Sequence, residues 1–245
     1  MKADLTAETQ RRRGERTTKA HLISDFRSSL RLCASAVILS LAFLGEVVNA
    51  AEEMGKVLYQ NDFSKGEIGK LPDEMLLLDG GFAVQEISGN KVLQLPGAPL
   101  DTFGVLFGPT EAANLAVSAR VHGTKKGRRE PAFAIGLNGN AGYRLQVSAA
   151  KKLLELYKGD DVVAKEPFSW ESDSWMMLKL QVRKVKEGEF VVEGKAWKHG
   201  TPEPAKPTLT HTENAEPLAG RASLWGNPFA GTPIDFDDLV VSAIK

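Results

Sequence analysis

Apolar and polar residues alternate along several short segments of the chain. In residues 115–122 (LAVSARVH) every second side chain from Leu115 to Val121 is apolar, whereas Arg120 and His122 fall on the other side. Because successive side chains of a strand point to opposite faces, this period predicts a β-strand with one buried face. Similar segments recur from residue 57 onward, separated by Gly, Asn, Asp or Pro, and no convincing helical period accompanies them.

Four pairs of these segments are joined by short turns and therefore predict antiparallel hairpins. The turns are expected at Gly89–Asn90, Asn138–Asn140, Gly159–Asp160 and Glu187–Gly188. The proline-rich segment 201–217 is excluded from any central strand, because proline cannot donate to the ladder. About a dozen short strands predict an all-β fold with two packed antiparallel sheets, a β-sandwich or jelly roll.

The second half of the chain carries a recognisable order of motifs: DSWMMLKLQV, then GEFVVEGKAWKHG, LAGRASLWG and PIDFDDLVVSAI. This order resembles the concanavalin A-like lectin/glucanase superfamily, especially its bacterial LamG-like members. There a Trp begins a long strand, the hairpin partner carries Lys-x-Trp, and a Phe-Asp-Asp-aliphatic strand closes the chain. The early LYQNDFS is similar to the opening strand of such domains.

The resemblance covers residues 57–245 and implies a concanavalin A-like sandwich. It also implies that a first strand near Tyr59–Phe63 lies beside the last, near Asp238–Ile244. Some relatives are 3-keto-glycoside hydrolase-like domains, so the superfamily includes glycan binders and enzymes. The fold alone does not choose between them.

The N-terminal residues have the pattern of a secretory signal peptide. Residues 1–31 hold eight Lys or Arg against four acids, and an uncharged run of thirteen residues, Leu32–Leu44, follows. Val48-Asn49-Ala50 then provides small or compact residues for cleavage after Ala50. We therefore expect a signal peptide over 1–50, one β-sandwich domain over 51–245, and a secreted, periplasmic or cell-envelope location. Thirteen residues are too few to span a bilayer, which needs about twenty.

Cleavage changes the composition of the chain. Lys plus Arg fall from 31 to 23 and Asp plus Glu from 31 to 26, so the net charge becomes −3. This charge argues against a nucleic-acid partner, which calls for a basic surface. The single cysteine, Cys33, leaves with the signal peptide, so the expected mature chain has no thiol to form a disulfide or ligate a metal.

Three acids, Asp235, Asp237 and Asp238, precede the last apolar run and are the first candidates for chemistry. Laminarinase-type glucanases place three carboxylates on one face of one strand, at every second position. Here Asp235 and Asp237 share a face, Leu239 takes the third position, and Asp238 is expected to point the other way. The acids are therefore not that triad, and two alternatives stay open: strand-entry residues, or a calcium site.

A calcium site would use Asp62, Asp235 and Asp237, because clustered hard oxygens suit Ca²⁺ and Asp62 ends the first strand. The histidines expected in the mature chain, His122, His199 and His211, lack the spacing of a zinc site. Calcium is accordingly the one cofactor considered, and no catalytic residue is nominated.

Aromatic residues with polar neighbours suggest a sugar-binding face, because pyranose rings stack on aromatic rings while their hydroxyls need hydrogen bonds. Alternation along 190–199 places Trp197 with charged residues and opposite the aliphatic ones. The alternative is a solvated sheet whose Trp197 is covered by the proline-rich loop. The candidate ligand-binding residues are Trp197, Arg144, Arg183, Glu193, Lys195 and Trp225.

Three functions fit this sequence. The first is a secreted, non-catalytic glycan-binding or cell-envelope interaction domain that binds a carbohydrate or glycosylated surface through the open face of one sheet. The second is a glycoside-active hydrolase of the same superfamily, and the third is a purely structural envelope module. After signal cleavage, no membrane-spanning segment is expected.

Overall fold

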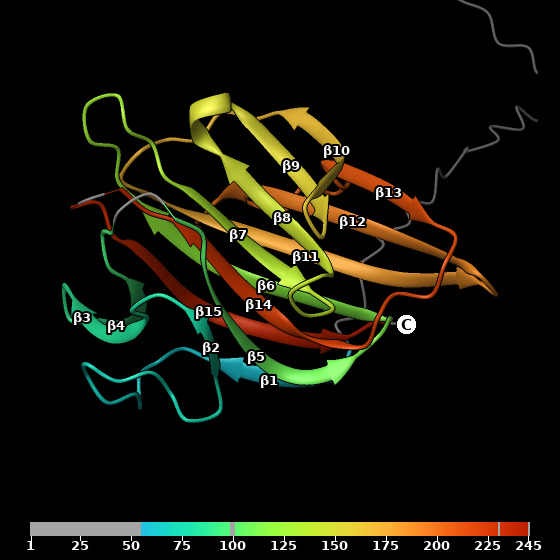
Figure 1. Ribbon diagram of the computed structural model, residues 1–245, viewed down its shortest axis with the longest axis horizontal. Coiled ribbons are helices and arrows are strands. Elements are labelled where there is room, and N and C mark those ends of the chain that lie inside the picture. The colour runs from blue at the N-terminus through green and yellow to red at the C-terminus, as the bar shows by residue number, and fades with distance from the viewer. Residues whose placement is uncertain (1–54, 99–100, 230, 245) are drawn as a thin grey trace, which may run out of the picture. The chain divides into compact units, whose positions relative to one another are not determined.

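The computed structural model describes residues 55–98, 101–229 and 231–244 of the chain (Figure 1). The predicted signal peptide and its cleavage site lie outside these residues. Within the described ranges, no helix is long and apolar enough to cross a membrane. The described residues form two antiparallel β-sheets with one short 3₁₀ helix, Ala149–Lys151, which confirms the predicted all-β sandwich.

The first sheet, called sheet A, has eight strands. Seven follow one path and β1 (Val57–Asn61) pairs with β15 beside that path. In order across the sheet, the seven strands are β13 (Leu209–Glu213), β12 (Glu189–Lys198), β11 (Ser174–Lys186), β6 (Leu115–Gly123), β15 (Ile234–Ala243), β4 (Asn90–Leu95) and β3 (Ala83–Ile87).

The second sheet, called sheet B, has seven strands and lies in front of sheet A in Figure 1. In order across the sheet, they are β10 (Asp161–Pro167), β9 (Leu153–Lys158), β8 (Tyr143–Ser148), β7 (Ala132–Leu137), β14 (Gly220–Asn227), β5 (Phe103–Glu111) and β2 (Leu76–Asp79).

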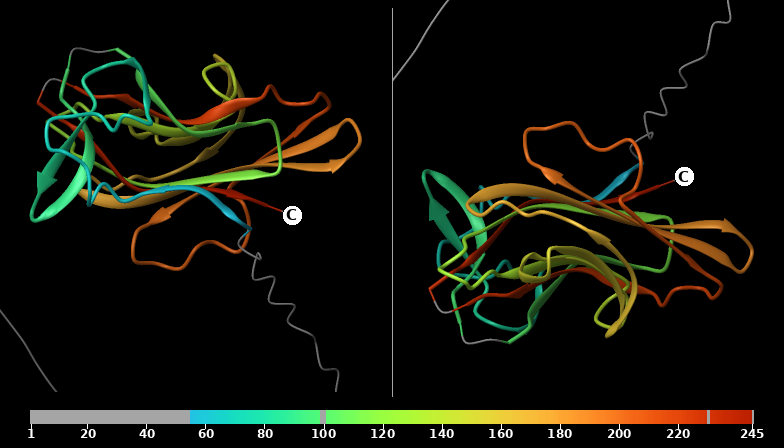
Figure 2. Two further views of the ribbon diagram at one scale, coloured as in Figure 1. Left: turned by 90° about the horizontal axis from the view of Figure 1, so that it is seen from below. Right: turned by 90° about the horizontal axis from the view of Figure 1, so that it is seen from above.

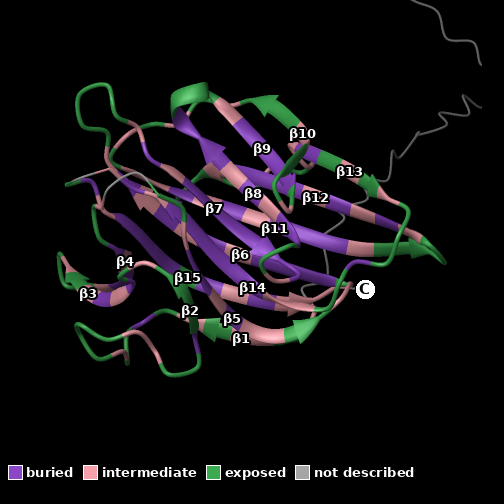
Figure 3. Cartoon of the chain, in the orientation of Figure 1, coloured by how far each residue is buried: buried purple, intermediate pink, exposed green. Residues whose placement is uncertain are grey.

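The core lies between the two layers, which Figure 2 shows edge-on. Alternate side chains of both sheets point inward, and Phe107, Phe133 and Phe236 are fully buried there. The central strands are mostly buried, whereas exposed residues gather in loops and along the edge strand β10 (Figure 3). Burial of these apolar faces stabilises the fold, and each sheet keeps an outer face on which polar side chains can gather.

The predicted pairing of the first and last strands is confirmed, because β1 runs antiparallel to β15 with Tyr59 opposite Val241. Three predicted hairpin turns are also found where the sequence places them. The fourth is displaced by one residue: Ile87 pairs with Asn90, so Ser88 and Gly89 form the turn with φ of 52° and 81°. Two positive φ values at the central positions are those of a type I′ turn, which matches the twist of the flanking strands.

The expected orientation of Asp238 is wrong because β15 contains a β-bulge. The pairing of β15 with β6 shifts between Asp237 and Val240, and Asp238 has a φ of 50°. The extra residue breaks the alternation, so Asp238 reaches Arg120, with 3.0 Å between its Oδ2 and the Nε of Arg120. Leu239 consequently enters the core.

Candidate functional site

The predicted residues around Trp197 do share the outer face of sheet A. The long β11–β12 hairpin places Trp197 opposite Met177, Lys195 opposite Lys179, and Glu193 opposite Gln181. Gln181 donates a hydrogen bond to Glu193 over 2.6 Å. The predicted alternation of this strand is therefore correct.

The loop 201–208 closes part of this face. Glu203 of the loop accepts hydrogen bonds from Lys195 over 2.7 Å and from Lys179 over 3.1 Å. Lys195 is only 6% exposed as a result. Trp197 is half-buried and lines a groove of about 180 Å³ with Met177, Val240 and other residues. The face is thus neither an open aromatic platform nor fully sealed.

Arg144 and Trp225 do not join the residues near Trp197. Arg144 lies on β8 and Trp225 on β14, and both strands belong to sheet B. A single binding face with both Arg144 and Trp197 would require β8 and β12 to share a sheet, and they do not. Arg183 stays on sheet A, where it pairs weakly with Glu193 at 3.8 Å. The predicted ligand-binding residues are therefore divided between the two outer faces.

The C-terminal acids form a polar network on the outer face of sheet A with residues from β6 and β4. Asp235 accepts a hydrogen bond from Gln94 over 2.8 Å and contacts the Nδ1 of His122 at 3.0 Å. Asp237 is 1% exposed and pairs with Arg120, while Asn90 donates to it over 2.7 Å. Every one of these acceptors has a partner, as buried carboxylates require.

Among the described residues, Asp62 shares no hydrogen bond with this network, although its charge acts on Asp238. Its Oδ1 accepts hydrogen bonds from the backbone and the hydroxyl of Ser64, at 3.0 Å and 2.7 Å. Among the described residues, no group of three or more His, Cys, Asp or Glu side chains is placed to hold a metal ion. The geometry thus assigns the three predicted calcium ligands to separate hydrogen-bonding roles.

The outer face of sheet B carries a different cluster, built around Arg144. Its guanidinium carbon lies 4.7 Å from the ring centroid of Tyr157 on β9, directly opposite in the ladder, and 5.3 Å from that of Trp225 on β14. Both distances are within the range of cation–π attraction. These two rings approach Arg144 from opposite sides along the sheet.

Trp225 is held in place by its neighbours rather than presented to solvent. Its indole Nε1 donates to the hydroxyl of Ser223 over 2.9 Å, and the residue is 8% exposed. Gly104 leaves room for the ring, because a Cβ there would lie 2.7 Å from two ring carbons. Trp225 therefore supports Arg144 and is not itself an open stacking platform.

Glu155 is a buried carboxylate in the same face and is 3% exposed. Ser148, Lys151 and Tyr157 all donate hydrogen bonds to it. Burial would raise the pKa of Glu155, but these hydrogen bonds outweigh burial and lower it. The group therefore stays ionised, and this is the opposite of what a glycosidase general acid needs.

A cavity of about 320 Å³ lies on the outer face of sheet B, beside Arg144 and Tyr157. This volume is within the usual range of small-ligand sites, about 300–1,000 Å³. Among the described residues lining it, the only carboxylate is Glu130, which pairs with Lys125 at 2.8 Å. Its polar and aromatic lining includes Thr102, Glu130, Arg144, Gln146, Lys151 and Tyr157.

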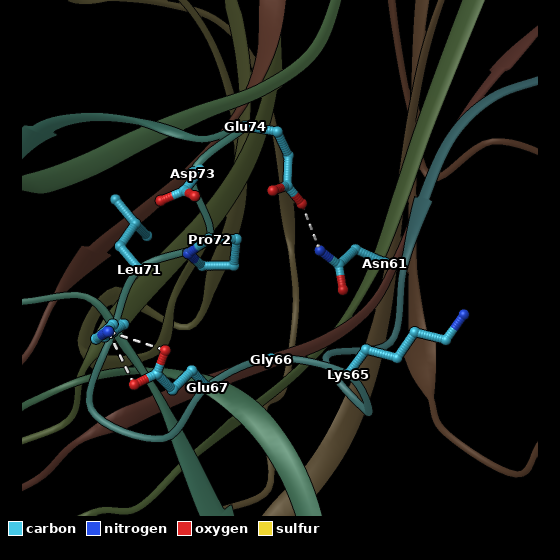
Figure 4. A pocket seen from close by; sticks show the side chains of 9 residues that line it. Asn61, Lys65, Gly66, Glu67, Leu71, Pro72, Asp73 and Glu74 are labelled. Carbon is cyan, nitrogen blue, oxygen red and sulfur yellow. Dashed lines mark hydrogen bonds and ion pairs between the residues drawn. The ribbon is translucent and has the colours of Figure 1, made fainter.

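A second depression, of about 290 Å³, lies among the loops after β1 (Figure 4). Its charged groups largely satisfy one another: Glu67 pairs with Lys70 at 2.8 Å, and Asn61 donates to Glu74 over 2.9 Å. No aromatic ring lines it among the described residues. The cavity on sheet B is therefore the better candidate for sugar recognition.

Comparison with known proteins reveals the fold but no close relative. No family model and no curated protein matches the chain. A Bacillus subtilis protein of unknown function with a galectin-like fold matches with a TM-score of 0.56 and 14% identity, over 79% of this chain and 99% of that one.

Two enzyme structures are similar to a comparable degree. The catalytic domain of a glycoside hydrolase family 131 protein from Coprinopsis cinerea has a TM-score of 0.51 and 11% identity, over 78% of this chain and 98% of that one. A β-1,3-glucanase from Mycobacterium marinum has a TM-score of 0.51 and 12% identity, over 76% and 99%. The chain has the concanavalin A-like jelly-roll fold.

Within this concanavalin A-like fold, sequence reasoning missed Tyr157, Glu155 and Lys151. The segment LLELY alternates and so puts Glu155 and Tyr157 on one face. That signal is present in the sequence. The alternation does not show, however, that this strand pairs with the strand of Arg144, or that the register places Tyr157 opposite Arg144.

Proposed function

We propose that this protein is a secreted or cell-envelope glycan-binding module without catalytic activity, and that it binds sugar in the cavity on the outer face of sheet B. The observation that carries the proposal is Arg144, held by Tyr157 and Trp225 at the wall of a 320 Å³ cavity. An aromatic ring and convergent polar groups in one cavity are what a sugar needs. The fold, shared with glycoside-active proteins, is compatible with this function, and secretion rests on the pattern of residues 1–50.

The hydrolase alternative is less well supported by the same cavity. Glycoside hydrolysis requires two carboxyl groups about 5–10 Å apart across the scissile bond, one of them protonated. The described lining offers Glu130 alone, and nearby Glu155 is ionised and occupied by three donors. The geometry therefore favours binding over cleavage.

Two substitutions of an exposed alanine by tryptophan test where sugar binds. Ala150 is exposed and lines the cavity on sheet B, so Ala150→Trp would fill the cavity at little cost in folding. Ala205 is also exposed but lies in the loop over sheet A, so Ala205→Trp is the matched control. The full chain would be screened on a glycan array, and each variant titrated against the glycans retained.

We expect Ala150→Trp to weaken binding at least about tenfold, a loss of about 1.4 kcal/mol, and Ala205→Trp to leave it within about twofold. Release of new reducing ends from a bound glycan would show catalysis and contradict the proposal. Failure of the wild-type chain to bind any glycan would instead support the structural module.

A further inference from the structure

Arg144 is half-buried on the outer face of sheet B, and it has no acidic partner among the described residues. Its Nε is buried and makes no hydrogen bond. The nearby Glu155 is already engaged by Ser148, Lys151 and Tyr157, and Asp160 influences Arg144 only through its charge. The guanidinium is thus held by two aromatic rings and by no carboxylate.

Burial of the Arg144 guanidinium without a carboxylate partner costs free energy unless an anion binds to it. A partly buried charge loses hydration, and burial accordingly lowers the pKa of Arg144. The rings of Tyr157 and Trp225 offset part of that loss through cation–π attraction. They cannot accept the in-plane N–H groups, and those of the two terminal nitrogens stay available at the cavity wall.

The other charged groups lining the cavity are already paired. Lys151 bonds to Glu155, and Glu130 bonds to Lys125. Gln146 donates its amide to Ser148 over 2.9 Å, which leaves its carbonyl oxygen to accept a hydrogen bond from a hydroxyl. The cavity therefore offers one unmatched cation beside a neutral acceptor.

We propose, on the basis of the glycan-binding function proposed above, that Arg144 recognises a carboxylate and that the ligand is an acidic glycan containing uronic acid residues. The planar fork of a guanidinium matches a carboxylate with two parallel hydrogen bonds. A uronic acid also carries hydroxyls for Gln146 and an apolar ring face for Tyr157. The negative charge that Arg144 lacks within the protein is supplied by the sugar.

The experiment compares one polymer in two charge states. The full chain is titrated with polygalacturonate and with the same polymer after reduction of its carboxyl groups to alcohols, and separately with dextran sulfate and dextran. The variants are Arg144→Gln and Arg144→Lys, which keeps the charge but loses the fork. Lys206→Gln is the control, because it removes one positive charge from the exposed loop over sheet A.

We expect polygalacturonate to bind and Arg144→Gln to weaken that binding about 10- to 100-fold, or about 1.4–2.7 kcal/mol, because the variant removes a charged hydrogen-bond donor. Arg144→Lys should bind with an intermediate affinity, and Lys206→Gln should match the wild type within about twofold. Near-ultraviolet circular dichroism establishes that each variant is folded. The carboxyl-reduced polymer should bind at least about tenfold more weakly than its parent.

Three outcomes would overturn this inference. Equal binding of the native and carboxyl-reduced polymers would mean that charge is not recognised, while the proposed glycan-binding function would survive. Dextran sulfate binding in preference to polygalacturonate would assign Arg144 to sulfate instead. Absence of binding to every glycan, neutral or acidic, would remove the proposed function as well.

Discussion

His122 and Asp235 face each other across the β6–β15 ladder, with 3.0 Å between the imidazole Nδ1 and a carboxylate oxygen. The other ring nitrogen, Nε2, lies 3.2 Å from Asp173. One imidazole therefore joins the buried acid of the last strand to an acid in the turn before β11. Such a contact is strongest when the ring is protonated and both nitrogens donate.

This relationship predicts a pH-dependent stability. The hydrogen bond to Asp235 raises the pKa of His122, against the opposing effect of burial, and Asp173 raises it further. A raised pKa in the folded state means that protonation stabilises the fold: the contribution is full below the unfolded value, about 6.5, and is lost as pH rises through the folded pKa.

Chemical denaturation of the wild type and of His122→Gln between about pH 5.5 and 8.5 would measure this effect. The difference in unfolding free energy between the wild type and His122→Gln should shrink as pH rises. Taking this difference cancels the contributions of His199 and His211, which both proteins contain. Asp235→Asn should reduce the pH dependence. A difference that is constant over this range would show that folding does not raise the pKa of His122.

The pair of Arg120 and Asp237 makes a second prediction about the same network. Arg120 contacts Asp237, which is almost fully buried, and its guanidinium carbon lies 4.5 Å from the ring centroid of Trp175. Arg120→Ala leaves a buried carboxylate without its cation and should lower the unfolding free energy by about 3–5 kcal/mol. Equilibrium denaturation in urea measures the loss.

The matched control is Arg183→Ala. Arg183 is partly exposed and lies 3.8 Å from Glu193, a geometry that contributes less than about 1 kcal/mol. Equal losses from the two arginines would mean that burial of Asp237 is not what makes its pair important.

Much of the fold could be predicted from the sequence because period-two alternation is a local signal. It located the hairpins and placed Trp197, Glu193 and Lys195 on one face, as found. It failed at Asp238, because a bulge adds a residue without leaving a mark in the hydrophobic pattern. It also could not assign the strand of Arg144 to sheet B, since partners across a sheet are fixed by long-range pairing.

The third prediction concerns the effect of calcium on stability. Asp62, Asp235 and Asp237 each accept hydrogen bonds from separate partners, so an ion would have to displace them. We expect the Tm to be the same with millimolar Ca²⁺ as with a chelator, because a ligand stabilises only a fold that binds it. A Tm that rises with Ca²⁺ and falls again with chelator would restore the calcium site.

Processing provides the fourth prediction. The basic, apolar and small-residue pattern of residues 1–50 predicts an exported chain that begins at Ala51. Mass spectrometry of the N-terminal peptide of the exported protein checks it. Recovery of residues 1–50 intact in the exported pool would show that the segment is not a cleaved signal peptide.

The last prediction concerns Trp197, because its substitution tests which of the two outer faces binds sugar. Its ring is half-buried and lines the groove with Met177 and Val240, which are apolar. Trp197→Ala should therefore cost about 2–3 kcal/mol of unfolding free energy, less than the about 3–5 kcal/mol of a fully buried Trp. Glycan binding should persist, because the proposed site is on sheet B. If Trp197→Ala instead abolished binding while Ala150→Trp did not, the sugar would bind on sheet A, and Trp197 would be the stacking residue that the alternation of its strand first suggested.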